Sequence, residues 1–313
     1  MLSRIADSLF WLNRYMERAQ GVLRVSYVRY ILSLDKNIHH NLTWRPVLEI
    51  FAHLDEDEIL HLENDAALAL PKLITQTENA NSVKNMVLHA RENARGVQDY
   101  ITKEVWEDVN GLYHMVNQPD LPERLAELNA LQTLEMLSGK CVAYAGITDI
   151  TMPRGQGWNF MNLGKYIERS LETIALTEKE YEHIGYNLAQ ERDVMQWRSL
   201  LLSLSGYELH LKNYRKGNIN LNVLHQVIFN VDFPRSILYS FKRIRRYLND
   251  IVKDNPSDET MLLVNSFCRL HSRIRYMDPE DIEKVDLKTF LMELRIELLK
   301  FSTQFGQLFF SYH

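Results

Sequence analysis

Glycine and proline are scarce in this chain, and the shortage restricts its fold more than any other feature. The sequence holds 12 Gly and 8 Pro among 313 residues, whereas average usage would give about 38 of the two together. Sheet proteins need these residues at their many turns, and α/β proteins need them at each crossover. The shortage therefore predicts an all-α protein, and a hydrophobic content of 46% excludes a disordered or collagen-like chain.

Apolar residues recur at steps of three and four from Ile5 to Tyr27, which is the period of an amphipathic helix. This pattern predicts one long helix over residues 3–34. The rest of the chain continues the helical period and predicts a bundle of about ten helices. The further helices are expected from 43, from 82 with a continuation after Thr102, and over 123–148, 158–183, 190–216, 221–230, 234–253, 257–277 and 286–312.

The glycines are unevenly spread, because five of the twelve fall between residues 139 and 164. Pro153 lies in the same stretch. We expect a loop over 151–157, between two long helices, and we expect this loop to be a hinge or a binding loop.

Charge and cysteine content indicate a cytoplasmic protein. The net charge is −5, with both signs interspersed, so the chain does not resemble a nucleic-acid binder. No run approaches the eighteen or so apolar residues of a membrane span, and the amphipathic N-terminus lacks the apolar core of a signal peptide. Two cysteines without metal or redox spacing favour a reducing compartment.

Short motifs recur at an offset that grows slowly from 151 to 166 residues, which indicates an internal duplication. We expect two related helical halves, residues 1–150 and 151–313, packed as one compact unit about a pseudo-two-fold axis. The matched pairs are Leu12–Arg18 with Leu163–Arg169, Trp44-Arg45 with Trp197-Arg198, Ser82-Val83 with Ser236-Ile237, and Leu125–Leu128 with Leu291–Leu294.

Each half carries a Glu-Arg pair, Glu17-Arg18 in the first and Glu168-Arg169 in the second. Neighbouring residues on a helix point about 100° apart, so each side chain needs a partner elsewhere. In a structural interpretation, Glu17 pairs with Arg169 and Glu168 pairs with Arg18, because buried charges must be paired. In a binding interpretation, both arginines present planar forks to a phosphate or carboxylate, and both glutamates orient them or bind an amine.

Two further basic clusters are candidates for ligand binding. Arg91, Asn93 and Arg95 lie on one predicted helix, where like charges four residues apart favour a bridging anion or acid. Arg154 and Trp158 lie where a helix N-terminus follows the glycine-rich loop, and its backbone amides favour an anion. A solvated helix face and an ordinary helix connection are the respective alternatives.

The sequence provides no motif that assigns catalysis. Two Glu-x-x-His pairs, Glu58/His61 and Glu180/His183, have the spacing of di-metal bundle proteins. Glu58 lies in what resembles a solvated acidic face and Glu180 lies near a predicted helix end, so we predict no metal site and no cofactor. No nucleophile elbow, phosphate loop or dinucleotide fingerprint occurs, and the catalytic residues are unknown.

The same motifs, taken in order along the chain, resemble those of the bacterial alpha-E domain family, an all-helical family named for its Glu-Arg motif. The resemblance covers essentially the whole chain, with Pro153, Lys165 and Ser170 as mild departures. The matching segments are Leu2-Ser-Arg-Ile-Ala6 through Glu17-Arg18-Ala19, Ala90-Arg-Glu-Asn-Ala-Arg95 with Trp106-Glu107 and Asn110, Thr151-Met152 through Trp158 to Glu168-Arg169, and Phe233-Pro-Arg-Ser236.

This resemblance implies a role beside a circularly permuted ATP-grasp amide ligase and a transglutaminase-like protein, in making or modifying small peptides. It supplies no catalytic residues. We therefore expect a non-catalytic helical binding or scaffold protein, with a small peptide or amino-acid-like ligand. An enzyme using Glu17 or Glu168 as acid and base in a pocket between the halves is the alternative, and a metal-binding bundle is more remote. The ligand and any homo-oligomer stay open.

Overall fold

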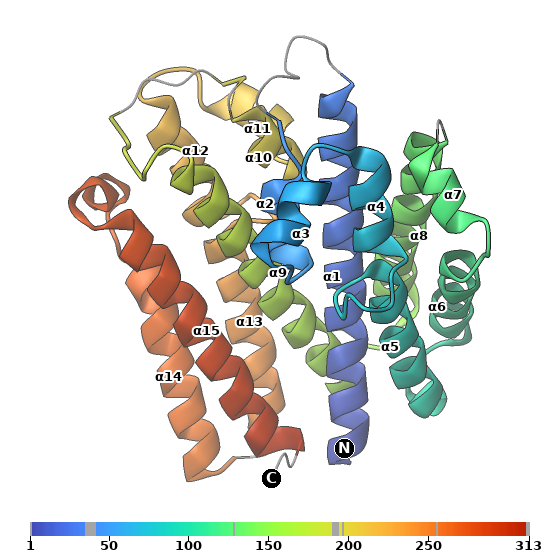
Figure 1. Ribbon diagram of the computed structural model, residues 1–313. Coiled ribbons are helices and arrows are strands. Elements are labelled where there is room, and N and C mark those ends of the chain that lie inside the picture. Colours follow the sequence, from blue (N-terminus) through green and yellow to red (C-terminus); the bar gives the residue numbers. More distant parts are fainter. Residues whose placement is uncertain are drawn as a thin grey trace. The chain divides into compact units, whose positions relative to one another are not determined.

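The structure, a computed structural model, describes residues 2–34, 42–127, 129–189, 194–195, 197–254 and 256–310, with the backbone alone at 279 and 280 (Figure 1). Over these residues the chain forms fifteen α-helices and two 3-10 helices, without a strand. The predicted all-α class is therefore confirmed. The helices exceed the expected ten because several segments that the sequence pattern left undivided form short helices of six to nine residues.

The described residues group into two compact units. One unit comprises Trp11–Arg154, and the other comprises Met1–Phe10 with Gly155–His313. Helix α1 (Ser3–Ser33) contributes its first turns to the second of these units and its remainder to the first. The sequence-based division into related halves at residue 150 stays a prediction.

The unit Trp11–Arg154 is built around four long helices, and four short ones fill the connections. Helix α5 packs on α6, and α6 packs on α8. Helix α1 joins the group through Tyr15, which stacks on His89 of α5, and through Tyr27, whose hydroxyl bonds Glu135 of α8. With α1, the helices are α2 (Arg45–Phe51), α3 (Glu56–Leu62), α4 (Ala66–Ile74), α5 (Val83–Gly96), α6 (Lys103–Val116), α7 (Leu121–Ala126) and α8 (Ala130–Thr151), with the 3-10 helix η1 (Gln98–Tyr100).

The other unit has four long helices that pack in a ring, α9 on α13, α13 on α14, α14 on α15, and α15 on α9. Its core is aromatic: Phe10 stacks on Phe305 with ring centroids 5.6 Å apart, and Phe267 lies 4.8 Å from Phe301. Its helices are α9 (Gln156–Glu182), α10 (Arg198–Ser203), α11 (Tyr207–Asn213), α12 (Ile219–Ile228), α13 (Ile237–Lys253), α14 (Asp258–Arg275) and α15 (Leu287–Phe310), with the 3-10 helix η2 (Pro279–Lys284).

Aspartates divide the acidic stretch that follows α2 into separate helices. Asp55 accepts a hydrogen bond from the Glu58 N–H and begins α3, and Asp65 accepts one from the Ala67 N–H and begins α4. A side-chain acceptor at this position satisfies a donor that has no partner within the helix. Two starts so close together leave room only for short helices.

The expected loop over 151–157 is wrong in extent, because α8 continues to Thr151 and α9 begins at Gln156. Only four residues connect the two helices, with the extended Gly155 as the N-cap of α9. The other four glycines of this stretch lie within helices, and a side chain at Gly139 or Gly146 would meet no neighbour. Most of the glycine cluster therefore lies within helices, and a hinge or binding role of the four-residue connection stays a prediction.

The described part of the predicted helix over 190–216 forms α10 and α11, and residues 190–193 and 196 lie outside the described residues. One of the repeat matches also fails to join equivalent elements. Leu125 lies in the six-residue α7, whereas Leu291 lies in the 24-residue α15, and Leu128 lies outside the described residues.

Candidate functional site

The first Glu-Arg pair lies in the middle of α1. Glu17 is 5% exposed, and the half-buried Arg18 donates from NH1 to the Asn81 side-chain oxygen at 3.2 Å. Asn81 directly precedes Ser82, whose hydroxyl caps α5 by accepting from the Asn85 N–H. Arg18 therefore ties α1 to the start of α5.

The second Glu-Arg pair makes an equivalent contact in the other unit. Glu168 is 6% exposed on α9, and Arg169 donates from NH1 to the Pro234 carbonyl at 3.3 Å. Pro234 lies two residues before Ser236, which caps α13. In each unit, the arginine of the motif thus bonds the segment that leads into the neighbouring capped helix. The ion pairing expected between the two motifs stays a prediction.

Arg91 brings together residues from two helices. Its Nε donates to the Asn110 side-chain oxygen at 2.7 Å, and its NH1 pairs with Glu92 at 3.3 Å. The guanidinium carbon lies 4.4 Å from the centre of the Tyr113 ring and 5.8 Å from the Trp106 ring. We call Arg91, Glu92, Trp106, Asn110 and Tyr113 the Arg91 cluster.

The α6 members of this cluster lie on one helix face, because positions 106, 110 and 113 are one and two turns apart. Both aromatic rings and Asn110 are partly exposed, and the Arg91 side chain is 23% exposed. A guanidinium held against aromatic faces keeps a fixed plane, which suits recognition of a carboxylate or phosphate. The cluster thus presents a partly exposed guanidinium that pairs with Glu92 and has a rigid aromatic support.

The neighbouring candidates Asn93 and Arg95 stay within their own helix. Glu92 pairs with Arg95 NH2 at 2.6 Å, so its carboxylate lies between Arg91 and Arg95 and offsets their repulsion. The Asn93 amide donates to the His89 carbonyl at 2.9 Å. The acid expected to bridge Arg91 and Arg95 is therefore Glu92 of the same helix.

Arg154 faces the end of α8. Its NH2 donates to the Asp149 carbonyl at 2.5 Å and to the Asp149 carboxylate at 3.1 Å. A cation at this position satisfies carbonyls of the last helical turn and opposes their partial negative charge. Trp158 lies half-buried in the first turns of α9, where its carbonyl accepts from Asn162.

The interior of the unit Trp11–Arg154 contains polar groups that sequence reasoning missed. The Tyr144 hydroxyl donates to the Asn13 side-chain oxygen at 2.5 Å in the buried core. Burial, with the nearby charges of Asp108 and Glu17, raises the pKa of the Cys141 thiol to about 12. This thiol therefore stays protonated at neutral pH and is not an activated nucleophile.

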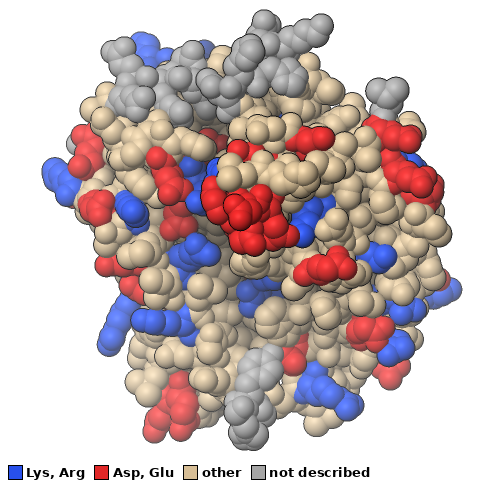
Figure 2. All heavy atoms as spheres, in the orientation of Figure 1, with Lys and Arg blue, Asp and Glu red and all other residues tan. Residues whose placement is uncertain are grey.

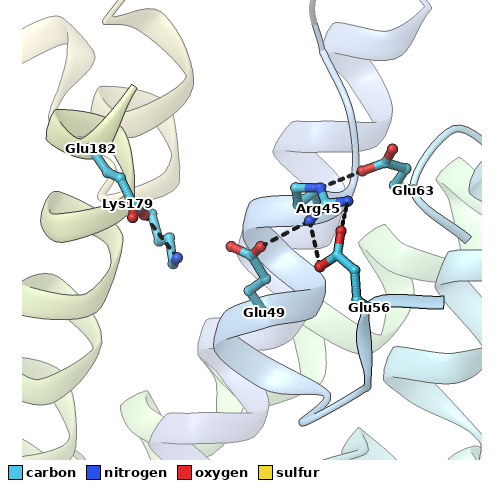
Figure 3. A network of polar contacts seen from close by, with 6 residues as sticks. All are labelled: Arg45, Glu49, Glu56, Glu63, Lys179 and Glu182. Carbon is cyan, nitrogen blue, oxygen red and sulfur yellow. Dashed lines mark hydrogen bonds and ion pairs between the residues drawn. The ribbon is translucent and has the colours of Figure 1, made fainter. Parts of the chain in front are cut away.

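An ion-pair network that sequence reasoning also missed connects the short helices after α1. Figure 3 shows Arg45 at the start of α2 bonded to Glu49, Glu56 and Glu63, at distances of 3.5, 2.8 and 2.6 Å. The Trp44 N–H donates to the Glu63 carbonyl at 2.7 Å. Hydrogen bonding to Arg45 lowers the pKa of Glu56. Because Arg45 bonds Glu49 of its own helix, Glu56 of α3 and Glu63 at the end of α3, it links α2 to α3.

The same figure shows Lys179 paired with Glu182 one turn later on α9, at 2.9 Å. This pair is the i, i+3 contact of an exposed helix face. It contributes little to stability because both side chains are solvated.

Charges of both signs are interspersed over the face seen in Figure 2, and acidic side chains gather over the region of α3. No helix among the described ranges combines the length and apolar character that a membrane crossing requires. Within the same ranges, no three His, Cys, Asp or Glu side chains gather as a metal site would need.

Comparison with models of protein families shows which family the chain belongs to. The model of the Alpha-E family, described as a predicted alpha-helical domain with a conserved ER motif, matches residues 1–310. This chain belongs to the Alpha-E family. Glu-Arg pairs occur in this chain at Glu17-Arg18, Glu123-Arg124, Glu168-Arg169 and Glu191-Arg192.

Curated relatives of this Alpha-E chain include uncharacterised proteins of Mycobacterium bovis and of Mycobacterium tuberculosis strains CDC 1551 and H37Rv. Each is 24% identical over 312 residues, covering 93% of this chain and 34% of the relative. The chain thus spans about a third of the length of these relatives. No solved structure matches the chain.

Proposed function

We propose that this Alpha-E chain is a non-catalytic helical binding or scaffold protein that serves an ATP-grasp amide ligase. The Arg91 cluster is the observation that carries the proposal. It offers a half-exposed guanidinium against two aromatic rings, which would recognise the carboxylate of a small peptide or an acidic group on the ligase. The residues of the family-like central motif, Arg91, Trp106 and Asn110, meet at this site.

The length of the relatives supports a function in which this chain acts together with another domain or protein. The matched region makes up 34% of each mycobacterial relative, so those chains carry about twice as much sequence outside it. The ligase and a transglutaminase-like protein are the partners that the family resemblance implies. Two free thiols fit the cytoplasm, where cysteines stay reduced.

We also propose that the two units arose by duplication. Three matched sequence pairs occupy equivalent structural positions: Arg18 and Arg169 each bond a segment leading into a capped helix, and Ser82 and Ser236 each cap that helix. In the third pair, a buried tryptophan forms the N-cap directly before the arginine that begins α2 or α10. Four long helices in each unit follow the same order.

The structural contacts of the motif arginines and the burial of the motif glutamates weigh against the alternative enzyme. Since Arg18 and Arg169 each bond their own bundle, they act as positioning groups for α5 and α13. Glu17 and Glu168 are 5% and 6% exposed, so general acid–base chemistry would require a substrate to reach a buried carboxylate. The enzyme using these glutamates remains the second candidate, and Glu17→Gln with Glu168→Gln would abolish its turnover.

Co-purification with a circularly permuted ATP-grasp protein of the same organism tests the proposal, followed by assay of ATP hydrolysis with candidate amines and acids. We expect Arg91→Gln to weaken association at least tenfold. Arg95→Gln is the matched control, because Arg95 lies one turn away on α5, is 62% exposed and pairs with Glu92 of its own helix. Absence of association, together with unchanged ligase turnover, would refute the proposal.

A further inference from the structure

The face of α6 opposite the Arg91 cluster is acidic and borders a groove. Glu104, Glu107 and Asp108 are spaced i, i+3 and i+4, so they share one face, about half a helical turn away from Trp106 and Asn110. Together with side chains of α8 they line a groove of about 410 Å³. A groove of this size accommodates a small organic ligand.

Asp108 lies at the inner wall of this groove and is poorly compensated. The residue is 9% exposed, and its Oδ2 is buried without a hydrogen-bond partner among the described residues. The nearest cation is the Lys140 ammonium, 3.9 Å from Oδ1. That separation exceeds hydrogen-bond distance, and the Lys140 side chain is 45% exposed, so the carboxylate keeps an unmet demand for a hydrogen-bond donor.

Burial raises the pKa of Asp108, and the charge of Lys140 only partly opposes this effect. An ordinary surface ion pair would leave the carboxylate without such a penalty. A second ammonium that donates directly to Asp108 would therefore stabilise its charged form more than Lys140 does.

The other wall of the groove is apolar. Ile147 and Ile150 of α8 line it, and Ile150 is 83% exposed. An aliphatic side chain so exposed at the rim gains from contact with an alkyl chain. The groove thus combines a buried carboxylate, two carboxylates nearer solvent, a hydrocarbon wall, Thr151 and the ammonium of Lys140. The three carboxylates outnumber this one cation, so the groove favours a further positive charge.

We propose that this groove binds a primary alkylammonium, with the ammonium at Asp108 and its carbon chain along Ile147 and Ile150. A lysine side chain and a free polyamine share this chemistry. A metal ion fits poorly, because no three ligands gather as a metal needs within the described residues. The site is separate from the Arg91 cluster and does not rest on the ligase association.

The whole chain, labelled with ¹³C at isoleucine methyls, would be titrated with 1,5-diaminopentane and with Nα-acetyl-lysine methylamide, and 1-pentanol would serve as the uncharged control. We expect the chemical shifts of the Ile147 and Ile150 methyl groups to change on addition of either amine and to remain unchanged on addition of the alcohol. Tighter binding of the lysine derivative assigns a protein partner's side chain as the ligand, and tighter binding of the diamine assigns a polyamine.

Asp108→Asn keeps the size of the side chain and removes its charge, so we expect affinity for the tighter amine to fall at least tenfold. Asp120→Asn is the control, because Asp120 is an exposed acid elsewhere in the same unit. Circular dichroism verifies folding of both variants. Methyl shifts that the alcohol reproduces, or equal affinities of Asp108→Asn and Asp120→Asn, would overturn the assignment.

Discussion

His271 on α14 is a buried group whose protonation we expect to weaken its helical unit in acid. It is 1% exposed, and neither ring nitrogen has a hydrogen-bond partner among the described residues. Its ring lies parallel to that of Phe267, with centroids 6.4 Å apart. Burial lowers the pKa of His271 from its ordinary 6.5 to about 4, and the positive charges of Arg245, Arg275 and Lys242 add to the effect. The folded state therefore holds a neutral imidazole.

The sign of the pH dependence follows from which state binds the proton first. Because the folded pKa is the lower one, the unfolded chain is protonated first as the pH falls, and stability drops between about pH 6.5 and pH 4. At about 1.4 kcal/mol per pKa unit, the full loss is roughly 3 kcal/mol. Of this, about 2 kcal/mol is lost between pH 7 and pH 5.

His271→Phe keeps a flat ring against Phe267 and removes the titrating group. We would measure the free energy of unfolding in urea at pH 7 and at pH 5. The unmodified chain should lose about 2 kcal/mol more than His271→Phe on this change of pH. His61→Phe, at an exposed position of α3, should behave like the unmodified chain. Equal losses for the unmodified chain and His271→Phe would refute a buried neutral histidine.

Three other substitutions or treatments test local features. Ser82→Ala removes the cap of α5 and should lower the free energy of unfolding in urea by about 1 kcal/mol; an unchanged value would mean that the cap is dispensable. Tyr144→Phe leaves the buried Asn13 oxygen without its donor and should cost about 1–3 kcal/mol in the same assay. Burial raises the pKa of the Cys141 thiol to about 12. In a Cys268→Ser background, alkylation of Cys141 should therefore be no faster than the local unfolding that exposes the thiol. Fast alkylation of the folded chain would contradict a buried, protonated Cys141.

Helix starts are partly readable from sequence, because capping is local. A helix is expected from residue 82, and Ser82 is indeed the residue that caps α5. The helix expected from residue 234 begins later, since Ser236 is the cap of α13 and Pro234 lies outside the helix. Thr102 occupies the N-cap position of α6, but its hydroxyl bonds that of Thr151 at 2.7 Å. The contact with Thr151, from a distant part of the sequence, thus replaced the local capping bond of Thr102.

The functional residues were harder to predict than the helices. The sequence placed Arg91 with Asn93 and Arg95 because they share a helix, yet the contacts that define the site come from α6. Asp108 was missed because it interrupts an otherwise apolar inner face, at Val105, Val109 and Leu112. A charged residue among such positions is a signal that could have identified it.

By itself, the sequence determined the all-helical class, the long first helix and membership of the Alpha-E family. These depend on the period of apolar residues, the scarcity of Gly and Pro, and ordered motifs, all of which lie along the chain. Only the tertiary structure decided that Arg18 bonds Asn81, that Arg91 lies on Tyr113 and that Asp108 borders a groove. Such pairings depend on which helix faces meet, and helical periodicity fixes a face without fixing its partner.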